Sequence, residues 1–444
     1  MPMNNYIIES SRNKPQPCEK NVKKLGTDLF SFKNLYKAYF GCRKLKRTTY
    51  HAAKFEMNFE SELLRLKEEL KSHNYKPGPS ICFAITDPKL REVWAADFRD
   101  RVVHHLLVSY LEPVWEKMFV FHSYACRKLK GAHKAIRNLK KIISPDLYFL
   151  QVDIQSFFVS IDKGVLISLI KKRVKHPEIL WLAEKIISHD PTTNYIPRGD
   201  LKLLQSVPPH KSLFDKIYYG LPIGNLTSQF FANVYLNELD QFIKHSLKCR
   251  HYFRYMDDLL LLSSSREQLL KWRDDIKTFV ETNLKLKLHP KKQILQPATN
   301  GINFCGYIIK PDYTLIRRRT VKKLKNKLWH FNQKVLKALD PDDISRAPLD
   351  NKNRLSSSQK TSNSLTGQAC DIIFNDPFIV FDNERFTDDF LHIFSSINSV
   401  YGFFKHANCY NLRKTLYEKH FGILKMYLQP ANRNYDYFIW NPMR

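Results

Sequence analysis

The chain reads Tyr252-Phe253-Arg254-Tyr255-Met256-Asp257-Asp258-Leu259-Leu260-Leu261-Leu262, two apolar segments separated by a pair of adjacent carboxylates. Short apolar runs around isolated acids are typical of strands that carry charge at their ends. The stretch therefore predicts a β-hairpin with Asp257 and Asp258 at its tip. The alternative is that the two aspartates only cap a surface turn, a position that Asp favours.

A third acid, Asp153, follows another apolar strand pattern, Tyr148-Phe149-Leu150-Gln151-Val152. Transfer of a nucleotide to a 3′ hydroxyl requires hard oxygen ligands for two magnesium ions about 4 Å apart. One ion activates the hydroxyl and the other neutralises the leaving pyrophosphate. Three carboxylates on two neighbouring strands match this requirement, so the pattern predicts a nucleotidyl-transfer site.

The composition favours a folded protein with a polyanionic partner. With 444 residues, of which 43% are hydrophobic, the chain is long enough for two or three subdomains. Its 72 Lys and Arg outnumber the 43 Asp and Glu, which gives a net charge of +29. This charge favours nucleic acid as the partner, although a solvated basic surface would have the same composition.

Neither a secretory segment nor a membrane span is expected. Residues 1–21 are polar, and nowhere do eighteen apolar residues follow one another. The eight cysteines lie far apart without a C-x-x-C pair, which argues against a zinc site or a disulfide framework. We therefore expect a soluble, cytoplasmic protein with reduced cysteines.

Other patterns indicate how the chain is organised. Phe59–Lys71 has a helical pattern and Ser80–Thr86 a strand-like one, which predicts an α/β region between Phe30 and Leu111. An amphipathic helix is expected after Gly224, with apolar residues at Phe231, Val234, Tyr235, Leu239 and Phe242.

Three patterns follow in the C-terminal third of the chain. Basic residues crowd the helical pattern Arg317–Lys327, which suits a helix that grips a phosphate backbone. Asp340–Cys370 is rich in Ser, Asn, Asp and Pro, which predicts a linker or a flexible insertion. Helical patterning returns over Phe390–Tyr427.

The residues Tyr255-Met256-Asp257-Asp258 resemble the signature of reverse transcriptases, and other motifs of that family follow the expected order between Phe30 and Lys327. Asp153 with Phe157-Phe158 resembles the first catalytic motif. The stretch Gly220-Leu221-Pro222-Ile223-Gly224-Asn225-Leu226-Thr227-Ser228-Gln229 is similar to the motif that beds the incoming base and the template. Lys291-Lys292 falls where the family carries a lysine near the pyrophosphate, and Phe304-Cys305-Gly306-Tyr307 resembles the hairpin that grips the primer terminus.

The resemblance implies roles for these residues. Asp153, Asp257 and Asp258 would be catalytic and, with the backbone carbonyl of Ile154, would bind two Mg²⁺ ions, for which Mn²⁺ is a possible substitute. The residues expected to bind the dNTP are Lys89, Arg91, Phe158, Ile223, Gly224, Gln229 and Lys292. The residues expected to bind nucleic acid are Arg127, Tyr255, Met256, Gly306, Tyr307, Arg317, Arg318 and Lys322.

Each of these roles has a plainer alternative. Phe158 would be the aromatic gate that excludes a ribose 2′ hydroxyl, but it could equally be a core residue, as aromatic residues usually are. Its neighbour Phe157 is the better core candidate. Any single lysine or arginine in the set could be solvated surface charge instead.

The resemblance also implies a right-hand polymerase of the α/β (α+β) class. Fingers and palm would surround an antiparallel sheet, followed by a helical thumb and a C-terminal helical extension. The expected segments are an N-terminal tail (1–29), fingers (30–146), a palm (147–310) with an insertion near 190–216, a basic thumb helix (311–339), a linker or insertion (340–385) and a C-terminal helical segment (386–444).

Within the family, Ala96–His105, Ser123–Arg127 and Ile223–Ala232 look most like bacterial enzymes of diversity-generating retroelements and their defence-associated relatives. Viral enzymes typically place Gln where Ile223 stands. Intron-encoded enzymes commonly end the same motif in Ser-Pro, where this chain reads Ser228-Gln229. Both groups therefore fit less well.

The chain departs from the compact diversity-generating pattern by the insertion at Thr192–Lys216 and by the extension beyond Asn332. The first biological interpretation is cDNA synthesis from a dedicated structured noncoding RNA in bacterial antiviral defence, and the second is retroelement mutagenesis. Expected partners are template RNA, cDNA and dNTPs, with a second copy of the chain or an accessory defence protein as further alternatives. Priming by a nucleic acid or by a protein side chain stays open.

Two rival functions remain. An RNA-dependent RNA polymerase shares the paired aspartates, but Phe158 argues against it, because such enzymes need a small or polar residue that accepts the 2′ hydroxyl. A catalytically silent RNA-binding module would suit the charge, but three intact acids oppose it.

Overall fold

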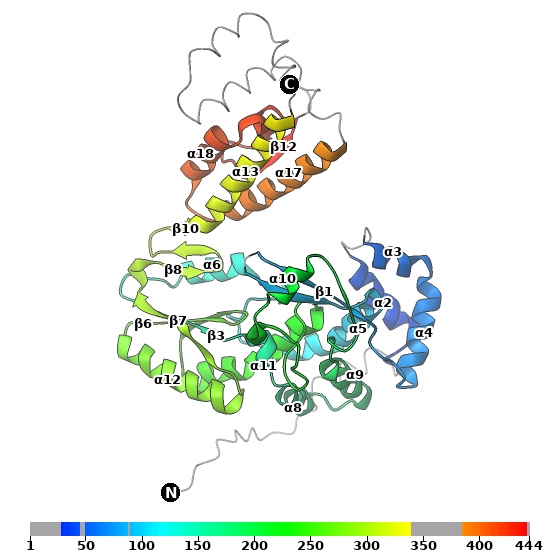
Figure 1. Ribbon diagram of the computed structural model, residues 1–444. Helices are drawn as coiled ribbons and strands as arrows, with labels where there is room; N and C mark the ends of the chain where they lie inside the picture. The colour runs from blue at the N-terminus through cyan, green and yellow to red at the C-terminus, as the bar shows by residue number, and fades with distance from the viewer. Residues whose placement is uncertain (1–27, 45–48, 88, 339–383, 442–444) are drawn as a thin grey trace, which may run out of the picture. The chain divides into compact units, whose positions relative to one another are not determined.

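In a computed structural model, which describes residues 28–44, 49–87, 89–338 and 384–441, the predicted hairpin pairs with the strand that precedes Asp153 (Figure 1). The hairpin consists of β5 (His251–Tyr255) and β6 (Asp258–Ser263), and the earlier strand is β3 (Tyr148–Ile154). With β7 (Leu288–Pro297) they form a four-stranded sheet in the order β5-β6-β3-β7. The predicted β5–β6 hairpin is confirmed, and β3 pairs with β6 in an antiparallel arrangement.

The chain divides into two compact units. The first comprises Met1–Ala135 and Asp146–Gln296, and the second comprises Ile136–Pro145 and Pro297–Arg444. The division between these units falls after Gln296, whereas the predicted segment boundary at residue 310 stays a prediction. The short strands after residue 301 pair with the strand that leads into the basic helix, so they belong with the second unit.

A second sheet in the first unit has the strand order β2-β1-β4. β1 (Ser80–Ile85) and β2 (Arg91–Ala95) form an antiparallel pair. β4 (Tyr195–Pro197) comes from the predicted insertion and pairs with β1 in parallel. The insertion thus adds a strand to the sheet that carries Arg91.

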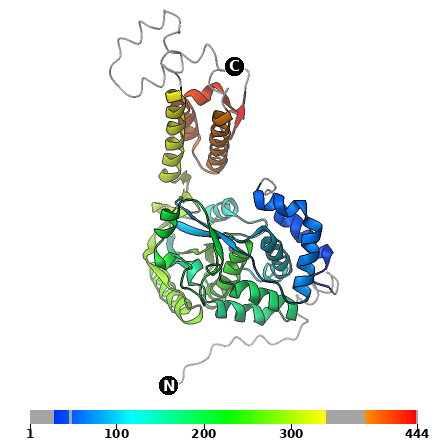
Figure 2. The same ribbon diagram turned by 45° about the vertical axis from the view of Figure 1, so that its right-hand side comes forward.

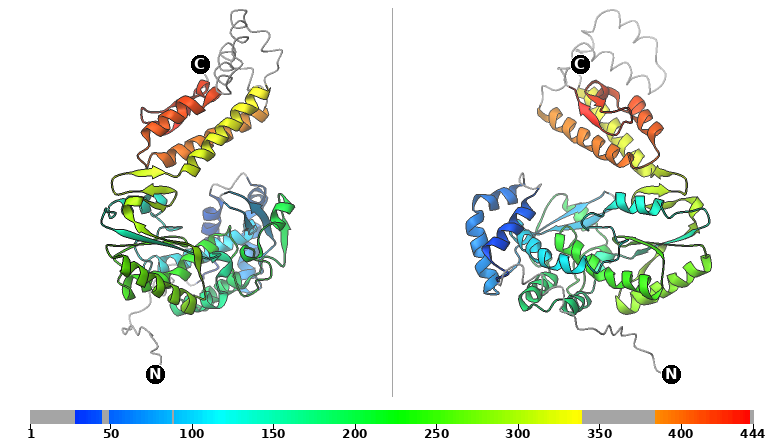
Figure 3. Two further views of the ribbon diagram at one scale, coloured as in Figure 1. Left: turned by 60° about the vertical axis from the view of Figure 1, so that its left-hand side comes forward. Right: turned by 180° about the vertical axis from the view of Figure 1, so that it is seen from behind.

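Helices cover this unit, and several lie on one face of the four-stranded sheet (Figures 1 and 3). α12 (Arg266–Asn283) packs against both β3 and β6, and Leu236, Leu261 and Ile276 contribute to one buried core. The helices before the sheet are α2 (Phe32–Arg43), α3 (Tyr50–Met57), α4 (Phe59–Lys71) and α5 (Phe98–Trp115). Those within and after it are α7 (Phe157–Ser160), α8 (Lys163–Arg173), α9 (Pro177–Ser188), α10 (Leu201–Gln205), the 3-10 helix η1 (Pro209–Lys211), α11 (Leu226–Gln241), the π-helix η2 (Phe242–Ser246) and α12 (Arg266–Asn283).

The second unit is built on helices with two small sheets. α13 (Arg318–Ala338) and α17 (Glu384–Phe404) run side by side (Figure 2). One sheet has the order β10-β9-β8 and the other is the pair β11-β12. The remaining elements are α6 (Ala132–Lys140), which spans the boundary, η3 (Ala298–Asn300), β8 (Ile302–Phe304), β9 (Tyr307–Ile309), β10 (Thr314–Ile316), α18 (Tyr410–His420), η5 (Gly422–Met426), β11 (Leu428–Pro430) and β12 (Phe438–Trp440).

Several predicted elements are confirmed. α4 covers Phe59–Lys71, β1 ends one residue before the expected Thr86, and α11 follows Gly224. The expected tail at 1–29 and linker at 340–385 lie almost wholly outside the described residues. Among the helices that the structure describes, none is long and apolar enough to cross a membrane.

Candidate active site

The tip of the β5–β6 hairpin is a two-residue turn made by Met256 and Asp257. Tyr255 pairs directly with Asp258, so no other residue lies in the turn. Met256 has a φ of 56°, a left-handed conformation that disfavours a side chain. Buried leucines at 259–262 anchor β6 in the core. The acidic turn is thus held at the edge of a rigid sheet.

Asp153 lies directly opposite Asp258 in the antiparallel pair of β3 and β6. Directly opposed residues point to the same face of a sheet, with Cβ atoms about 4.5–5.5 Å apart. Asp257, in the turn, directly precedes Asp258, and all three aspartates are partly exposed. The three predicted acids therefore gather at one end of the sheet.

Two neighbours bind these carboxylates in the structure. Gln151 lies two residues before Asp153 on β3, and its Nε2 atom donates to both oxygens of Asp258 at 2.8 and 3.0 Å. Lys292 on β7 forms an ion pair with Asp153 through its Nζ atom. The predicted dNTP-binding lysine is thus in contact with a predicted catalytic acid.

Positive charges from the β1–β2 connection also reach the acids. Lys89 and Arg91 are both exposed, and Arg91 is the first residue of β2. Burial raises the pKa of Asp257, while the charges of Arg91 and Lys89 oppose that rise. Burial lowers the pKa of Lys292, and Lys89 and Arg91 lower it further. The three predicted cations and the acids therefore share one electrostatic environment.

The oxygen atoms of the three aspartates and of Ile154 are of the kind that binds magnesium, but in this structure they do not point to a common position. Carboxylate oxygens are the ligands that Mg²⁺ prefers, and the expected carbonyl ligand belongs to Ile154, the last residue of β3. Within the described ranges, no three His, Cys, Asp or Glu side chains are close enough together to hold a metal ion. The contacts of Asp153 with Lys292 and of Asp258 with Gln151 occupy oxygens that would have to turn toward a metal.

Phe157 and Phe158 differ in burial. Phe157 is 2% exposed, whereas Phe158 is only partly buried and packs at the margin of the same core, with the two ring centroids 5.4 Å apart. The backbone carbonyl of Phe158 accepts a hydrogen bond from Leu221 N at 2.8 Å. The α7 turn is thus attached to the loop that contains Ile223.

That loop is also attached to β2. Trp94 N donates to the carbonyl of Ile223 at 2.7 Å, and Ala96 N donates to Asn225 Oδ1 at 3.1 Å. Gly224 has a φ of 122°, and a Cβ placed on it would lie 3.0 Å from the Trp94 carbonyl oxygen, so this close approach requires glycine. The loop, Arg91 and Phe158 therefore belong to one connected structure, and Gln229 is exposed on α11.

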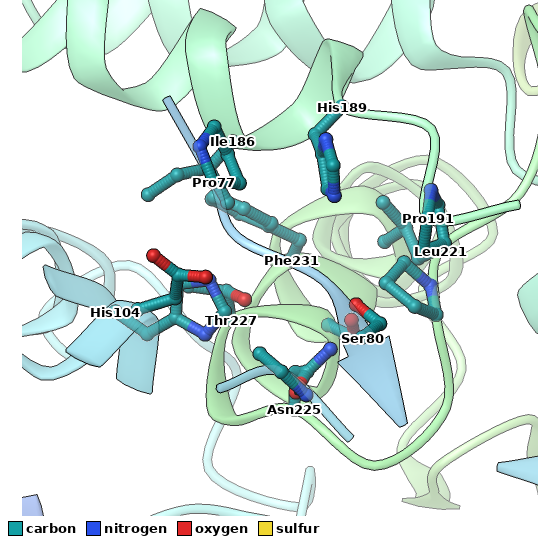
Figure 4. A pocket seen from close by; sticks show the side chains of 14 residues that line it. Pro77, Ser80, His104, Ile186, His189, Pro191, Leu221, Asn225, Thr227 and Phe231 are labelled. Atoms are coloured by element: carbon teal, nitrogen blue, oxygen red, sulfur yellow. The ribbon is translucent and has the colours of Figure 1, made fainter. Parts of the chain in front are cut away.

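A cavity of about 20 Å³ lies beside the same loop (Figure 4). His104 and His189 both line it, together with Asn225 and Thr227. His104 is 7% exposed, and among the described atoms its Nδ1 has no hydrogen-bond partner. Burial and the neighbouring His105 and His189 lower the pKa of His104 to about 3. This histidine is therefore neutral at physiological pH.

Comparison with known proteins decides the family. Residues 86–309, half of the chain, match the family described as reverse transcriptase (RNA-dependent DNA polymerase). The chain belongs to the reverse transcriptases. It is accordingly an RNA-directed DNA polymerase, of a family that uses divalent metal ions.

The relatives of this reverse transcriptase include bacterial and intron-encoded proteins. Protein YkfC of Escherichia coli (strain K12) is 25% identical over 298 residues, which cover 58% of this chain and 72% of YkfC. The group II intron-encoded protein LtrA of Lactococcus lactis subsp. cremoris is 22% identical over 329 residues, which cover 60% of this chain and 51% of LtrA. The chain therefore spans about half the length of LtrA, and intron-encoded enzymes are among its relatives although Ser228-Gln229 departs from their pattern.

Arg127 does not have the position expected of an RNA ligand in this reverse transcriptase. Its side chain is 5% exposed and forms an ion pair with Glu116 at 2.9 Å. Its Nη1 atom donates to the carbonyl oxygens of Val120 and Ser123 at 2.7 and 3.0 Å. The guanidinium fixes its own loop, and binding of nucleic acid by Arg127 stays a prediction.

Gly306 and Tyr307 are packed inside the second unit. Tyr307 is 0% exposed, its hydroxyl donates to the carbonyl of Phe403 at 2.8 Å, and the two ring centroids are 4.1 Å apart. A Cβ on Gly306 would lie 2.8 Å from the Phe403 ring. The Tyr307 side chain is therefore not available to a primer, and any contact of this hairpin would be through its backbone.

The predicted basic helix begins one residue later than expected. Arg317 precedes α13, and its side chain donates to Asn303. Arg318 and Lys322 are both exposed on the helix. The exposed positive charge that could contact a phosphate backbone therefore begins at Arg318, the first residue of α13.

Three residues near the turn were not singled out by the motifs. Gln151 binds Asp258, Arg254 is buried beneath the turn, and Cys126 has its Sγ atom 4.0 Å from the Sδ atom of Met256. The sequence alone could have identified Arg254 as a structural residue, because a charged residue inside an otherwise apolar strand needs a buried partner.

Proposed function

We propose that Asp153, Asp257 and Asp258 form the two-metal catalytic centre of this reverse transcriptase and hold two Mg²⁺ ions, with the Ile154 carbonyl as a further ligand. The direct pairing of Asp153 with Asp258 is the observation that carries the proposal. When bound, the ions would supply activation of the 3′ hydroxyl and charge neutralisation at the leaving pyrophosphate. The acids offset the mutual repulsion of two close cations.

Lys89, Arg91 and Lys292 would bind the triphosphate of the incoming nucleotide. Arg suits bidentate contact with phosphate oxygens, and Lys acts as a compact point charge. The Lys292–Asp153 ion pair supports a further step in this proposal. Lys292 neutralises Asp153 while the site is empty and turns to phosphate oxygens when the nucleotide arrives, which releases Asp153.

Phe158 would exclude the 2′ hydroxyl of a ribonucleotide. Its ring is partly exposed and belongs to α7, the short helix that follows Asp153 and the end of β3. The base and sugar of the incoming nucleotide would rest on Ile223, Gly224 and Gln229. The hydrogen bond from Trp94 N to the Ile223 carbonyl links these residues to β2, the strand that begins with Arg91. Nucleotide selection would therefore depend on one connected group of residues.

Primer extension on a defined RNA template tests this assignment. We expect Mg²⁺-dependent incorporation of dNTPs and little incorporation of NTPs. Efficient NTP incorporation would favour an RNA-dependent RNA polymerase instead. Tight RNA binding without extension under any divalent metal would favour a silent RNA-binding module.

We further propose that the template is a dedicated, structured noncoding RNA used in bacterial antiviral defence. The net charge of +29 supports a long polyanionic ligand. The insertion that supplies β4 and the C-terminal unit with α17 and α18 support a role beyond compact mutagenic enzymes. Sequencing the nucleic acid that copurifies with the chain, with and without dNTPs, tests this proposal.

A diversity-generating role is the second candidate, and Ile223 is the residue that favours it. We expect one defined RNA species and its faithful cDNA if the enzyme serves defence. cDNA of many sequences with changes confined to template adenines would favour the mutagenic role. A second copy of the chain or an accessory protein would be detected in the same preparation.

A further inference from the structure

Arg254 interrupts the apolar strand β5, and its side chain is buried, with 1% exposed. Its Nε and Nη2 atoms donate to the two oxygens of Asp240 at 2.7 and 2.6 Å. Nη2 also donates to Ser123 Oγ at 2.9 Å, and Nη1 donates to Asn233 Oδ1 at 3.0 Å. A fifth bond runs from Nη1 to the backbone carbonyl of Met256 at 3.1 Å.

The guanidinium is held in place by its partners. Asp240 is 0% exposed, and it accepts a further hydrogen bond from the Tyr252 hydroxyl at 2.7 Å. A buried ion pair is tolerated only when its remaining hydrogen-bonding groups are satisfied, which is the case here. With four bonds to side chains fixed in the core, the planar fork has no freedom to move away from Met256.

Met256 needs such a contact. It occupies the left-handed region with φ of 56°, where an ordinary side chain is disfavoured. Strained backbone of this kind persists only where the surrounding structure holds it. The Arg254 bond grips the peptide that joins Met256 to Asp257.

We propose that Arg254 is a positioning residue for catalysis, which sets the Met256–Asp257 turn and thereby the placement of Asp257 and Asp258. The inference rests on the proposed function of those two acids. Arg254 touches neither substrate nor the reacting atoms and acts through the turn. Asp240 is its buried anchor.

The backbone of Arg254 also fixes the loop beside the turn. Its amide donates to the His122 carbonyl at 2.9 Å, and its carbonyl accepts from Tyr124 N at 3.0 Å. The same loop brings Cys126 next to Met256. One residue therefore sets the position of the turn and of the exposed thiol that faces it.

The test compares Arg254→Lys with Tyr252→Phe. An ammonium group lacks the planar fork and cannot bond Asp240, Ser123, Asn233 and Met256 together. Tyr252→Phe removes one hydrogen bond to the same buried carboxylate but leaves the Met256 contact in place. The control therefore weakens the same buried cluster without removing the bond to the turn.

For Arg254→Lys we expect kcat to fall about 10- to 100-fold, as small misplacements of reacting groups do, with little change in KM for the dNTP. Without metal or nucleotide, exchange of the Met256 and Asp257 amides should accelerate about tenfold, as removal of a charge-assisted bond predicts. The rate of Cys126 alkylation, measured in the same metal-free state, should change together with the exchange rates of these two amides. Tyr252→Phe should lower the melting temperature and leave all three readouts close to those of the parent.

If Arg254→Lys does not fold, Asp240→Leu/Arg254→Met replaces it, because exchanging both buried charges for apolar groups is often tolerated. The double variant also lacks the Met256 bond and should show the same fall in kcat. A parental kcat in the folded variant, or an equal loss in Tyr252→Phe at matched stability, would overturn the inference. An active Asp258→Asn enzyme would overturn the proposed function itself, which is a separate outcome.

Discussion

Asp153 and Asp258 are direct cross-strand partners in β3 and β6, with Lys292 bound to the first and Gln151 to the second. Asp153→Asn, Asp257→Asn or Asp258→Asn should each abolish DNA synthesis, by about 1,000-fold or more, because several kcal/mol of charge stabilisation are removed. Folding should be nearly unchanged. For Asp257, whose pKa is raised by burial, the neutral amide removes a charge that is costly to bury.

Primer extension and thermal unfolding, measured on the same preparations, check this prediction. Asp274→Asn, the same change at an exposed acid on α12, is the matched control and should keep the parental activity. A purified Asp257→Asn protein that extends primers at the parental rate would show that the active site lies elsewhere.

Phe158→Ala should admit ribonucleotides, because removal of the ring opens the space that a 2′ hydroxyl would occupy. The ratio of kcat/KM for dNTP to that for NTP measures the effect. Phe157→Leu is the control, since Phe157 is a core residue at 2% exposure and its replacement should cost stability rather than sugar selection. If only the Phe157 variant accepts NTPs, the gate is one residue earlier.

RNA affinity should fall steeply with salt, and the exposed start of α13 should carry part of that dependence. Replacing Arg317, Arg318 and Lys322 with Ala should reduce the slope of log affinity against log salt by about 0.7 for each phosphate that the variant no longer neutralises. Because Arg317 is already bonded to Asn303, it should contribute less than the other two.

Three exposed cations on α12, Arg266, Lys271 and Lys277, provide a control in which the same number of charges is removed. Their replacement should leave the slope nearly unchanged. Equal slopes for the parent and the α13 variant would mean that other cations bind the RNA.

If the enzyme serves the mutagenic role, Ile223→Gln should lower misincorporation, most clearly opposite template adenine. An aliphatic side chain cannot hydrogen-bond the sugar of the incoming nucleotide, and each 1.4 kcal/mol of reduced discrimination is about tenfold in selectivity. Ile223→Leu, which keeps the site apolar, should behave like the parent. Error frequencies at each template base decide the matter, and equal values for Gln and Ile would leave Ile223 as packing beneath the loop.

Stability should fall in acid because of His104. In the folded chain the pKa of His104 is about 3, below the usual value for histidine. At pH values between these two pKa values, the unfolded chain therefore binds one more proton than the folded chain. The contribution of this group to stability is complete above the unfolded pKa and is lost as pH falls, by at most roughly 1.4 kcal/mol per pH unit. Denaturant titrations of His104→Leu between pH 7 and pH 4.5 should give a shallower dependence, whereas His245→Leu, at an exposed histidine, should match the parent.

Sequence patterns were sufficient for β3, for the β5–β6 hairpin and for α4, because short apolar runs bounded by acids and apolar residues at helical spacing indicate these elements. They also identified Asp153 together with Asp257 and Asp258, since acids at the ends of apolar strands stand out. The pairing of β5 with β6 followed from the hairpin, and the need to bring three carboxylates together placed β3 nearby, whereas β7 was not predicted.

Other features depended on interactions between distant segments. Nothing local distinguishes Arg127, whose charge is taken up by Glu116, from an exposed arginine. Tyr307 is buried because Phe403, almost a hundred residues later, packs on it. The parallel pairing of β4 with β1 likewise joins two short segments whose patterns give no indication of a shared sheet.

The central place of β3 in its sheet has a consequence for how the enzyme is made. Both of its neighbours, β6 and β7, come later in the chain, so β3 emerges from the ribosome well before either can pair with it. Both edges of an apolar strand then stay open while α8, α9 and α11 are synthesised, and open edges promote association between nascent chains. Asp153 lies near the end of that strand, and a charged side chain on an open strand edge opposes such association.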